Sequence, residues 1–351
     1  MSDQDASSLP PPDRPPRAAP PADEPLRPAA DAPEPAGVPP WGGAGPDDAS
    51  IVVAELVEEP CPLWPTFLTA VLAIGGALLV SGVVMVMAAF WARGPVLFQH
   101  PDAFNAWLKE FVATQGGLIL LVLPGQLTFC AVALVAASLS REKAVDRLGL
   151  RRGNFPPWTW PLFLLGTPVL VIAVGHLLSY VVREPSEQPK MLEDLFATHA
   201  AGSLVTLLLL ISLLPGVVEE LLFRGFMQRR LLGRLRPVAA IGITTAFFAA
   251  AHMDPTHAIG VAPLGIWLGV VAWRADSIWP AVFGHVGNNA FAILMSVTMG
   301  EQPDLEQLSP AVATSTGLAL LVSCLSFAGC LVLLSRRRAG PRPSVSVRPI
   351  A

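Results

Sequence analysis

The chain has 351 residues, of which 52% are hydrophobic and 14% charged, with a formal net charge of −4 at pH 7. Soluble domains carry about 25% charged residues, so this composition excludes an ordinary soluble protein. It predicts an all-α polytopic membrane bundle in the lipid bilayer, and we expect no nucleic-acid partner.

Residues 1–62 differ from the rest of the chain. The first 50 residues hold 14 of the 36 prolines, and nine Asp or Glu against three Arg. Such a segment cannot bury a core, so we expect a disordered, acidic spacer rich in Pro and Ala. It lacks the basic start and apolar run of a signal peptide. The alternative role for this tail is binding a partner through its proline-rich segments.

The apolar residues fall into eight stretches, each close to the roughly 20 residues that a transmembrane helix needs. The predicted spans are 66–92, 116–139, 158–182, 202–223, 237–253, 258–273, 278–299 and 311–335. The fifth and sixth are short, and one of them could be partly re-entrant. Between spans, 102–114 and 191–197 mix apolar and polar residues at helical spacing, as interfacial helices do.

The basic residues predict the orientation of these spans. With eight crossings, 19 of the 23 Lys and Arg fall on one side, chiefly in the loops 140–157 and 224–236 and in the C-terminal tail. Cytoplasmic loops carry this excess of positive charge, so both termini are expected in the cytoplasm. The membrane domain is then 63–335, followed by a basic tail at 336–351.

Two carboxylates end the apolar run 204–218. Ionisable groups within a span are costly, so they mark a candidate functional site. Glu219 and Glu220 are adjacent and diverge by about 100°, whereas Glu220 and Arg224 are four apart and share a face. We predict that Arg224 pairs with Glu220 and leaves Glu219 to face a cavity. A structural Glu–Arg cluster at the membrane boundary is the alternative.

Two further pairs have the same spacing of four residues. Phe248 and His252 share a helical face, on which an aromatic ring and an imidazole commonly pack. His285 and Asn289 also share a face, from which both side chains could donate hydrogen bonds to developing negative charge. Interhelical hydrogen bonds, common in membrane bundles, are the alternative for this pair.

A turn near Arg236 would bring the first two motifs together. Glu219 and His252 would then lie at nearly the same depth on antiparallel helices. His257 falls in an expected loop, and we interpret it as exposed or accessory.

The motifs Glu-Glu-x-x-x-Arg, Phe-x-x-x-His and His-x-x-x-Asn follow one another at 219–224, 248–252 and 285–289. In this order they resemble the CPBP family of intramembrane proteases, which comprises type II CAAX prenyl endopeptidases and bacterial Abi proteins. The resemblance covers about 200–295, the expected protease core. It implies an endopeptidase whose substrate is a membrane-associated protein or peptide.

The resemblance also implies roles for the motif residues. Glu219 and His252 would activate the attacking water, while His285 and Asn289 would stabilise the oxyanion. The supporting residues would be Glu220, Arg224 and Phe248.

Metal dependence stays open at this stage. One Glu and two His are the ligands of one type of catalytic zinc site, but His-Glu-x-x-His is absent. If zinc is bound, the expected ligands are Glu219, His252 and His285. Without a metal, the same residues act as base, orienter and oxyanion donor, and Asn289 beside His285 favours this second interpretation.

Other classes of protein compete with a protease. The motif residues could build a non-catalytic scaffold or an immunity-type pseudoenzyme. A transporter is less favoured, because no inverted repeat or glycine-broken span is visible. The Pro/Ala/Arg-rich tail and the absence of organelle signals indicate a bacterial plasma membrane.

Overall fold

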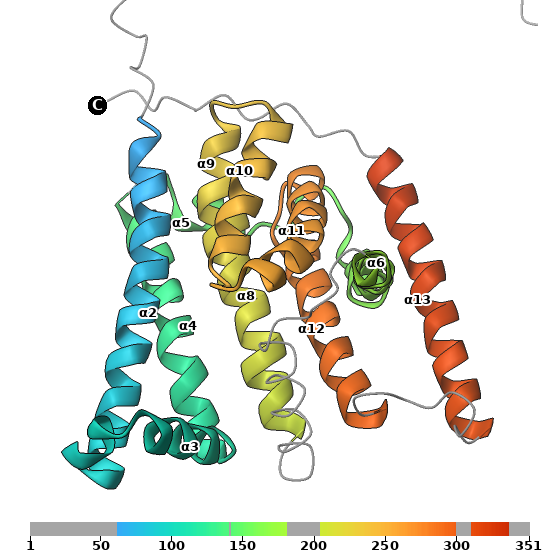
Figure 1. Cartoon of the computed structure of the whole chain (residues 1–351). Helices are drawn as coiled ribbons and strands as arrows, with labels where there is room; N and C mark the ends of the chain where they lie inside the picture. The colour runs from blue at the N-terminus through green and yellow to red at the C-terminus, as the bar shows by residue number, and fades with distance from the viewer. Residues whose placement is uncertain (1–61, 140–141, 181–203, 300–309, 337–351) are drawn as a thin grey trace, which may run out of the picture. The chain divides into compact units, whose positions relative to one another are not determined.

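The computed structural model describes residues 62–139, 142–180, 204–299 and 310–336. The tails 1–61 and 337–351 and the predicted interfacial segment 191–197 lie outside these ranges. Within the ranges the secondary structure is entirely helical, without a strand, so the predicted all-α fold is confirmed (Figure 1).

Every predicted span is a helix. These helices are α2 (Trp64–Arg93), α4 (Gln115–Ser138), α6 (Trp160–Ser179), the continuous segment Leu204–Leu232, α10 (Pro237–Ala250), α11 (Pro255–Ala275), α12 (Trp279–Met299) and α13 (Pro310–Arg336). Among the described residues, six of them are long and apolar enough to cross a membrane. α10 is too short, and His285 and two asparagines lower the hydropathy of α12. The protein is therefore a polytopic membrane protein, with six such helices instead of the eight predicted.

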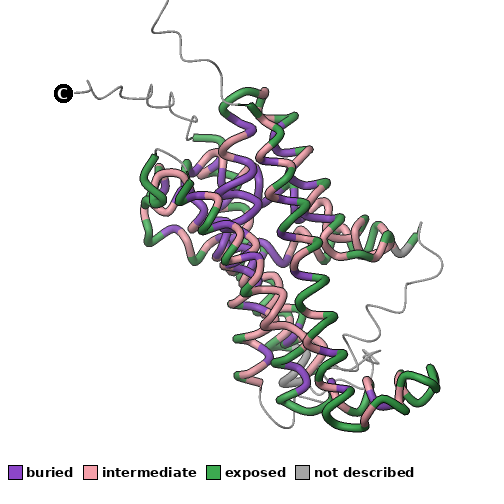
Figure 2. The backbone as a smooth tube through the Cα atoms, turned by 90° about the vertical axis from the view of Figure 1, so that its left-hand side faces the viewer, coloured by how far each residue is buried: buried purple, intermediate pink, exposed green. Residues whose placement is uncertain are grey.

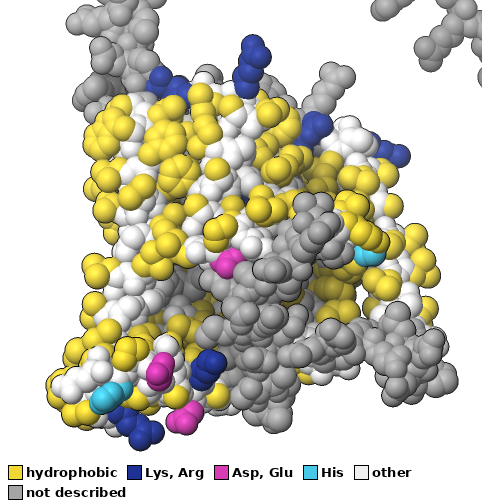
Figure 3. Space-filling view, viewed as in Figure 1, with side chains coloured by type: hydrophobic (Ala, Val, Ile, Leu, Met, Phe, Trp, Pro, Cys, Tyr) yellow, Lys and Arg dark blue, Asp and Glu magenta, His cyan; other side chains and the backbone are white. Residues whose placement is uncertain are grey.

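Short helices lie between the long ones. They are η1 (Pro95–Gln99), α3 (Pro101–Val112), α5 (Ala144–Arg147) and η2 (Pro157–Thr159). α3 confirms the helix predicted at 102–114. Its Trp107 is buried and stacks on Phe111, with 4.8 Å between ring centroids. Figure 3 shows charged side chains gathered at this lower end of the molecule, where exposed Arg93 and Glu110 pair at 3.9 Å.

The fourth helix is longer than predicted. It consists of η3 (Leu208–Leu213), α8 (Leu214–Glu220), η4 (Leu221–Gln228) and α9 (Arg229–Leu232), of which η3 and η4 are π-helical. The predicted loop 224–236 is therefore wrong, and only 233–236 forms the turn. The reason is that Arg224 is buried and paired, so it does not need water.

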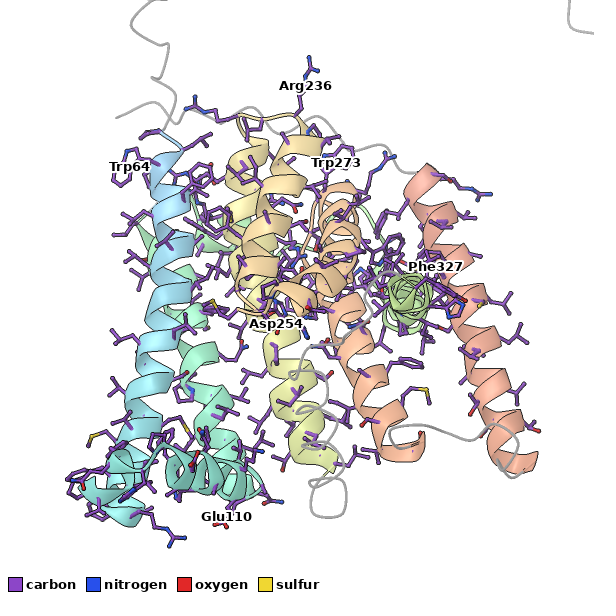
Figure 4. The ribbon with its side chains drawn as sticks, viewed as in Figure 1. Trp64, Glu110, Arg236, Asp254, Trp273 and Phe327 are labelled. Carbon is purple, nitrogen blue, oxygen red and sulfur yellow. The ribbon has the colours of Figure 1, made fainter. Side chains whose placement is uncertain are left out.

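α10 and α11 form a hairpin that enters and leaves at the same end. In Figure 4, Arg236 before α10 and Trp273 near the end of α11 lie at the upper end, whereas Asp254 between the helices lies about half-way down. α10 has 14 residues, about 21 Å of helix, which is too short to cross. The predicted fifth span is thus not a full crossing, whereas the sixth, α11, is long and apolar enough to cross.

The inner helices are more buried than the outer ones. In their most apolar stretches, 44% of the α11 residues and 39% of the Leu204–Leu232 residues are buried, against 17% for α2 and α4. Figure 2 shows the buried residues concentrated in the interior of the bundle. The motif residues therefore sit on the helices that are best enclosed by protein.

α6 crosses its neighbours at a steep angle and packs between α12 and α13. Figure 1 shows α6 end-on, while α2, α4 and α13 run from top to bottom. Glycines permit the close approach: a Cβ at Gly287 would overlap the carbonyl oxygen of Leu164, and one at Gly166 would lie 2.7 Å from the backbone nitrogen of Phe327. The absent side chains thus allow backbone-to-backbone packing on both faces of α6.

Replacing Gly166 by Ala should destabilise the fold, because the new methyl group meets the α13 backbone. Overpacking of this kind typically costs about 1–3 kcal/mol. Gly175→Ala on the same helix is the matched control, since an added Cβ there meets no atom within 4 Å. It should leave the unfolding temperature unchanged or raise it slightly. Thermal unfolding in detergent measures both, and equal shifts would contradict the tight crossing.

Candidate active site

The buried ion pair of Glu220 and Arg224 forms the centre of the site. Nη1 of Arg224 lies 2.7 Å from Oε1 of Glu220, and neither side chain is exposed. Nη2 donates to the carbonyl oxygen of Gly265 at 2.9 Å, and the guanidinium lies 4.5 Å from the ring centroid of Phe248. The predicted pairing is confirmed, and it joins the fourth helix to α10 and α11.

His285 lies between the two glutamates. Its Nδ1 is 2.9 Å from Oε1 of Glu220, and because a carboxylate only accepts, Nδ1 donates this bond. Its Nε2 is 3.9 Å from Oε2 of Glu219. The side chain of Glu219 is 13% exposed and that of Glu220 is fully buried. The adjacent carboxylates thus have different environments, as their divergence on the helix predicts.

His252 immediately follows α10 and stays close to it. Its Nδ1 donates to the carbonyl oxygen of Phe248 at 2.9 Å, so Nε2 is the ring nitrogen left to interact with a substrate or water. The rings of Phe248 and His252 pack edge to face at 5.1 Å, on the face that the spacing predicts. Phe248 also contacts the ring of His285 at 5.8 Å. One aromatic side chain therefore separates and orients both histidines.

His257 is closer to the site than the sequence indicated. It is half-buried in the first turn of α11, where Oδ1 of Asp254 accepts a hydrogen bond from its backbone nitrogen at 2.6 Å. Its ring stacks on His252 with 4.9 Å between centroids. The expected loop position is wrong, because the proline and Asp254 begin a helix here.

Asn289 bonds across to the fourth helix. Its Nδ2 donates to the carbonyl oxygen of Ile211 at 3.1 Å, and its Oδ1 accepts from Asn288 at 3.2 Å. Ser212 donates in the opposite direction, to the carbonyl oxygen of Val286 at 2.8 Å. This is the interhelical bonding that was the alternative for Asn289, although its second amide hydrogen is left for another acceptor.

Gln126 was not predicted, although it contacts Glu219. Gln126 reaches the site from α4, and its Nε2 lies 3.1 Å from Oε1 of Glu219. The sequence holds a usable signal, since an amide in an apolar span is costly in the same way as the residues of the motifs.

A zinc site requires three ligands within about 2 Å of one point. Among the residues that the structure describes, no group of three or more His, Cys, Asp or Glu is placed to hold a metal ion. The three residues predicted as ligands if zinc is bound, Glu219, His252 and His285, are therefore not grouped in this way in the described part of the chain.

The sequence of this region matches a known family. Residues 201–291 fit the family described as type II CAAX prenyl endopeptidase Rce1-like. This segment is an Rce1-like domain. The predicted resemblance is thus confirmed, and the domain includes all three motifs but not Gln126. No curated protein and no solved structure matches the chain. The six apolar helices identify an integral membrane protein, and its segment 201–291 is similar to the type II CAAX prenyl endopeptidases of the Rce1-like family.

Replacing Arg224 of the Rce1-like domain by Met should destabilise the protein strongly. The change leaves Glu220 as an uncompensated buried charge, which typically costs about 3–5 kcal/mol. Adding Glu220→Gln should recover part of the loss. The matched control is Arg229→Met, which breaks an ion pair with Asp276 that is partly exposed. Such pairs contribute about 0–1 kcal/mol. The measurement is unfolding in detergent. An equal loss of stability in Arg224→Met and Arg229→Met would contradict the central role of Arg224.

Proposed function

We propose that the chain is an intramembrane endopeptidase that hydrolyses a peptide bond of a membrane-associated protein or peptide. The observation that carries the proposal is the continuous set of contacts from Arg224 through Glu220 and His285 to Glu219, inside an Rce1-like domain. By resemblance, the reaction is of the CAAX type, in which a C-terminal tripeptide is removed after a lipid-modified cysteine.

The environments of the two carboxylates support different roles for them. Glu220 is enclosed and accepts from both Arg224 and His285, so it is held in place and cannot reach a substrate. Glu219 keeps some exposure and lies on the other side of His285. Glu219 is therefore the carboxylate that we assign as general base.

Charge balance suggests where a proton is held. Glu219, Glu220 and Arg224 together carry one excess negative charge in an apolar interior, where an unbalanced charge is costly. A proton shared between Glu219 and His285 neutralises the group. When His285 carries it, Nε2 becomes a donor, because Nδ1 is already bound to Glu220.

These assignments give a hydrolysis mechanism in which every proton has a donor and an acceptor. Glu219 takes a proton from a water molecule, whose oxygen attacks the scissile carbonyl carbon, and Nε2 of His252 orients that water. The protonated His285 and the second amide hydrogen of Asn289 donate to the oxyanion, and one such donor typically contributes about 3–4 kcal/mol. Glu219 then passes its proton to the leaving amine as the C–N bond breaks.

The position of the site suits a substrate that arrives through the bilayer. Asp254, in the turn after His252, lies about half-way between the upper and lower ends in Figure 4. An apolar groove between α2 and α4 extends to Ala251, directly before His252. We therefore propose lateral access for an apolar segment or a lipid-modified peptide.

The proposed location is a bacterial plasma membrane with both termini in the cytoplasm. Trp64 at the start of α2 and Arg236 lie at the same end in Figure 4, and Figure 3 shows Lys and Arg side chains along this upper edge. Cytoplasmic ends of membrane proteins carry such an excess.

A non-catalytic scaffold or pseudoenzyme is the second candidate. The observation that favours it is the bond from Asn289 to Ile211, which occupies a proposed oxyanion donor with a structural contact. A scaffold would cleave no peptide even as the wild type, which the first experiment below tests.

Glu219→Gln should abolish peptide cleavage while the protein stays folded, because the amide keeps the shape but cannot accept the proton. General base catalysis contributes about 10²- to 10⁴-fold to a rate. The measurement uses proteoliposomes with two probes, a farnesylated peptide ending in a CAAX sequence and a transmembrane peptide. Glu110→Gln on α3 is the matched control, since this carboxylate is exposed. Absence of cleavage by the folded wild type with both probes would favour the scaffold, whereas full activity in Glu219→Gln would exclude Glu219 as the general base.

Cleavage by the wild-type protein should be insensitive to metal chelators. The proposed steps use only side-chain protons, and the predicted ligands do not come together around one point. The rate is measured before and after incubation with a chelator and after addition of zinc. Loss of activity with the chelator and its return with zinc would assign a metal to the site instead.

A further inference from the structure

We infer that Gln126 is a positioning residue, which holds Glu219 in the orientation needed for proton abstraction. The inference rests on the proposed function. It adds a functional residue from α4, a helix outside the Rce1-like domain at 201–291.

The two oxygens of Glu219 have different partners. Oε1 lies 3.1 Å from Nε2 of Gln126, and Oε2 lies 3.9 Å from Nε2 of His285. A carboxylate only accepts, so the amide group must be the donor. The bond from α4 fixes one oxygen and thereby directs the other towards the histidine of α12. Without it, the carboxylate could rotate about its last bond.

The contact surface between α4 and the fourth helix sets this geometry. Phe129 and Phe223 pack edge to face at 6.2 Å, one turn further along both helices than Gln126 and Glu219. Gly125 allows a close approach to α2, because a Cβ there would lie 3.1 Å from Oγ of Ser81. The aromatic contact and the glycine together fix the rotation of α4, so Gln126 points at the site.

Stability alone does not account for Gln126. Its Oε1 is buried and, within the part of the chain that the structure describes, has no hydrogen-bond partner. An unpaired buried acceptor costs about 1–3 kcal/mol, and a hydrogen bond between membrane helices returns only about 0.6 kcal/mol. An apolar residue of the same size would therefore be at least as stable at this position. The remaining contact, with the proposed base, explains why an amide is present.

The test compares two substitutions that keep the size of the side chain. Gln126→Met removes the donor, and Gln126→Glu replaces it with a second carboxylate that repels Glu219. Each substitution removes a hydrogen bond to the charged carboxylate of Glu219 in the transition state. The loss should lower kcat about 10- to 100-fold, and more for Gln126→Glu, while KM stays nearly unchanged. Thr128→Val is the control on the same helix, since the hydroxyl of Thr128 donates to the carbonyl oxygen of Pro124 within its own helix. It should keep wild-type kinetics.

The assay uses the full chain in proteoliposomes with the farnesylated peptide, alongside thermal unfolding of each variant. A fall in kcat at wild-type unfolding temperature supports the positioning role. Provided that Glu219→Gln is inactive, two results would overturn the positioning role. One is an unchanged kcat in both Gln126 variants, and the other is a fall in activity that only matches the fall in the folded fraction of the protein. If the wild type does not cleave, or Glu219→Gln cleaves equally well, the proposed function fails and this inference falls with it.

Discussion

The geometry of the site depends on the side chain of Arg224. Its guanidinium binds Glu220 on its own helix, the carbonyl oxygen of Gly265 on α11 and the face of Phe248 on α10. Glu220 extends the set to His285 on α12. In an interior without water, each of these contacts is a condition for burying the charge. One cation therefore fixes four helical segments relative to one another.

This constraint separates the roles of two adjacent residues. Glu220 lies on the face of Arg224, whereas Glu219 is rotated by about 100° towards α4 and α12. The first carboxylate is fully buried and accepts from Arg224 and His285 through Oε1. The second keeps partial exposure and lies near Gln126 and His285. A Glu-Glu pair thus supplies one rigid anion and one reactive group from a single helical turn.

The sequence predicted what helical geometry determines locally. Residues four apart share a face, so the contacts of Glu220 with Arg224 and of Phe248 with His252 followed from spacing. Contacts between distant helices did not, and the bond from Gln126 to Glu219 has no such spacing. The prediction ends the fourth helix too early because it assigns a cluster of arginines to a loop, and that rule assumes that each arginine reaches water. Arg224 is the exception, since it is paired within the protein.

The turn between α10 and α11, which lies about half-way between the two ends in Figure 4, raises a further requirement that the same residues meet. A helix that ends within the bilayer leaves carbonyl and N–H groups without partners, which is tolerated only where protein satisfies them. His252 donates to the carbonyl oxygen of Phe248 at the end of α10, and Asp254 accepts from the backbone of His257 at the start of α11. The cap on α10 uses Nδ1 of His252, so a neutral ring presents a bare Nε2. The need to satisfy the broken backbone thereby selects the tautomer that a water-orienting histidine requires.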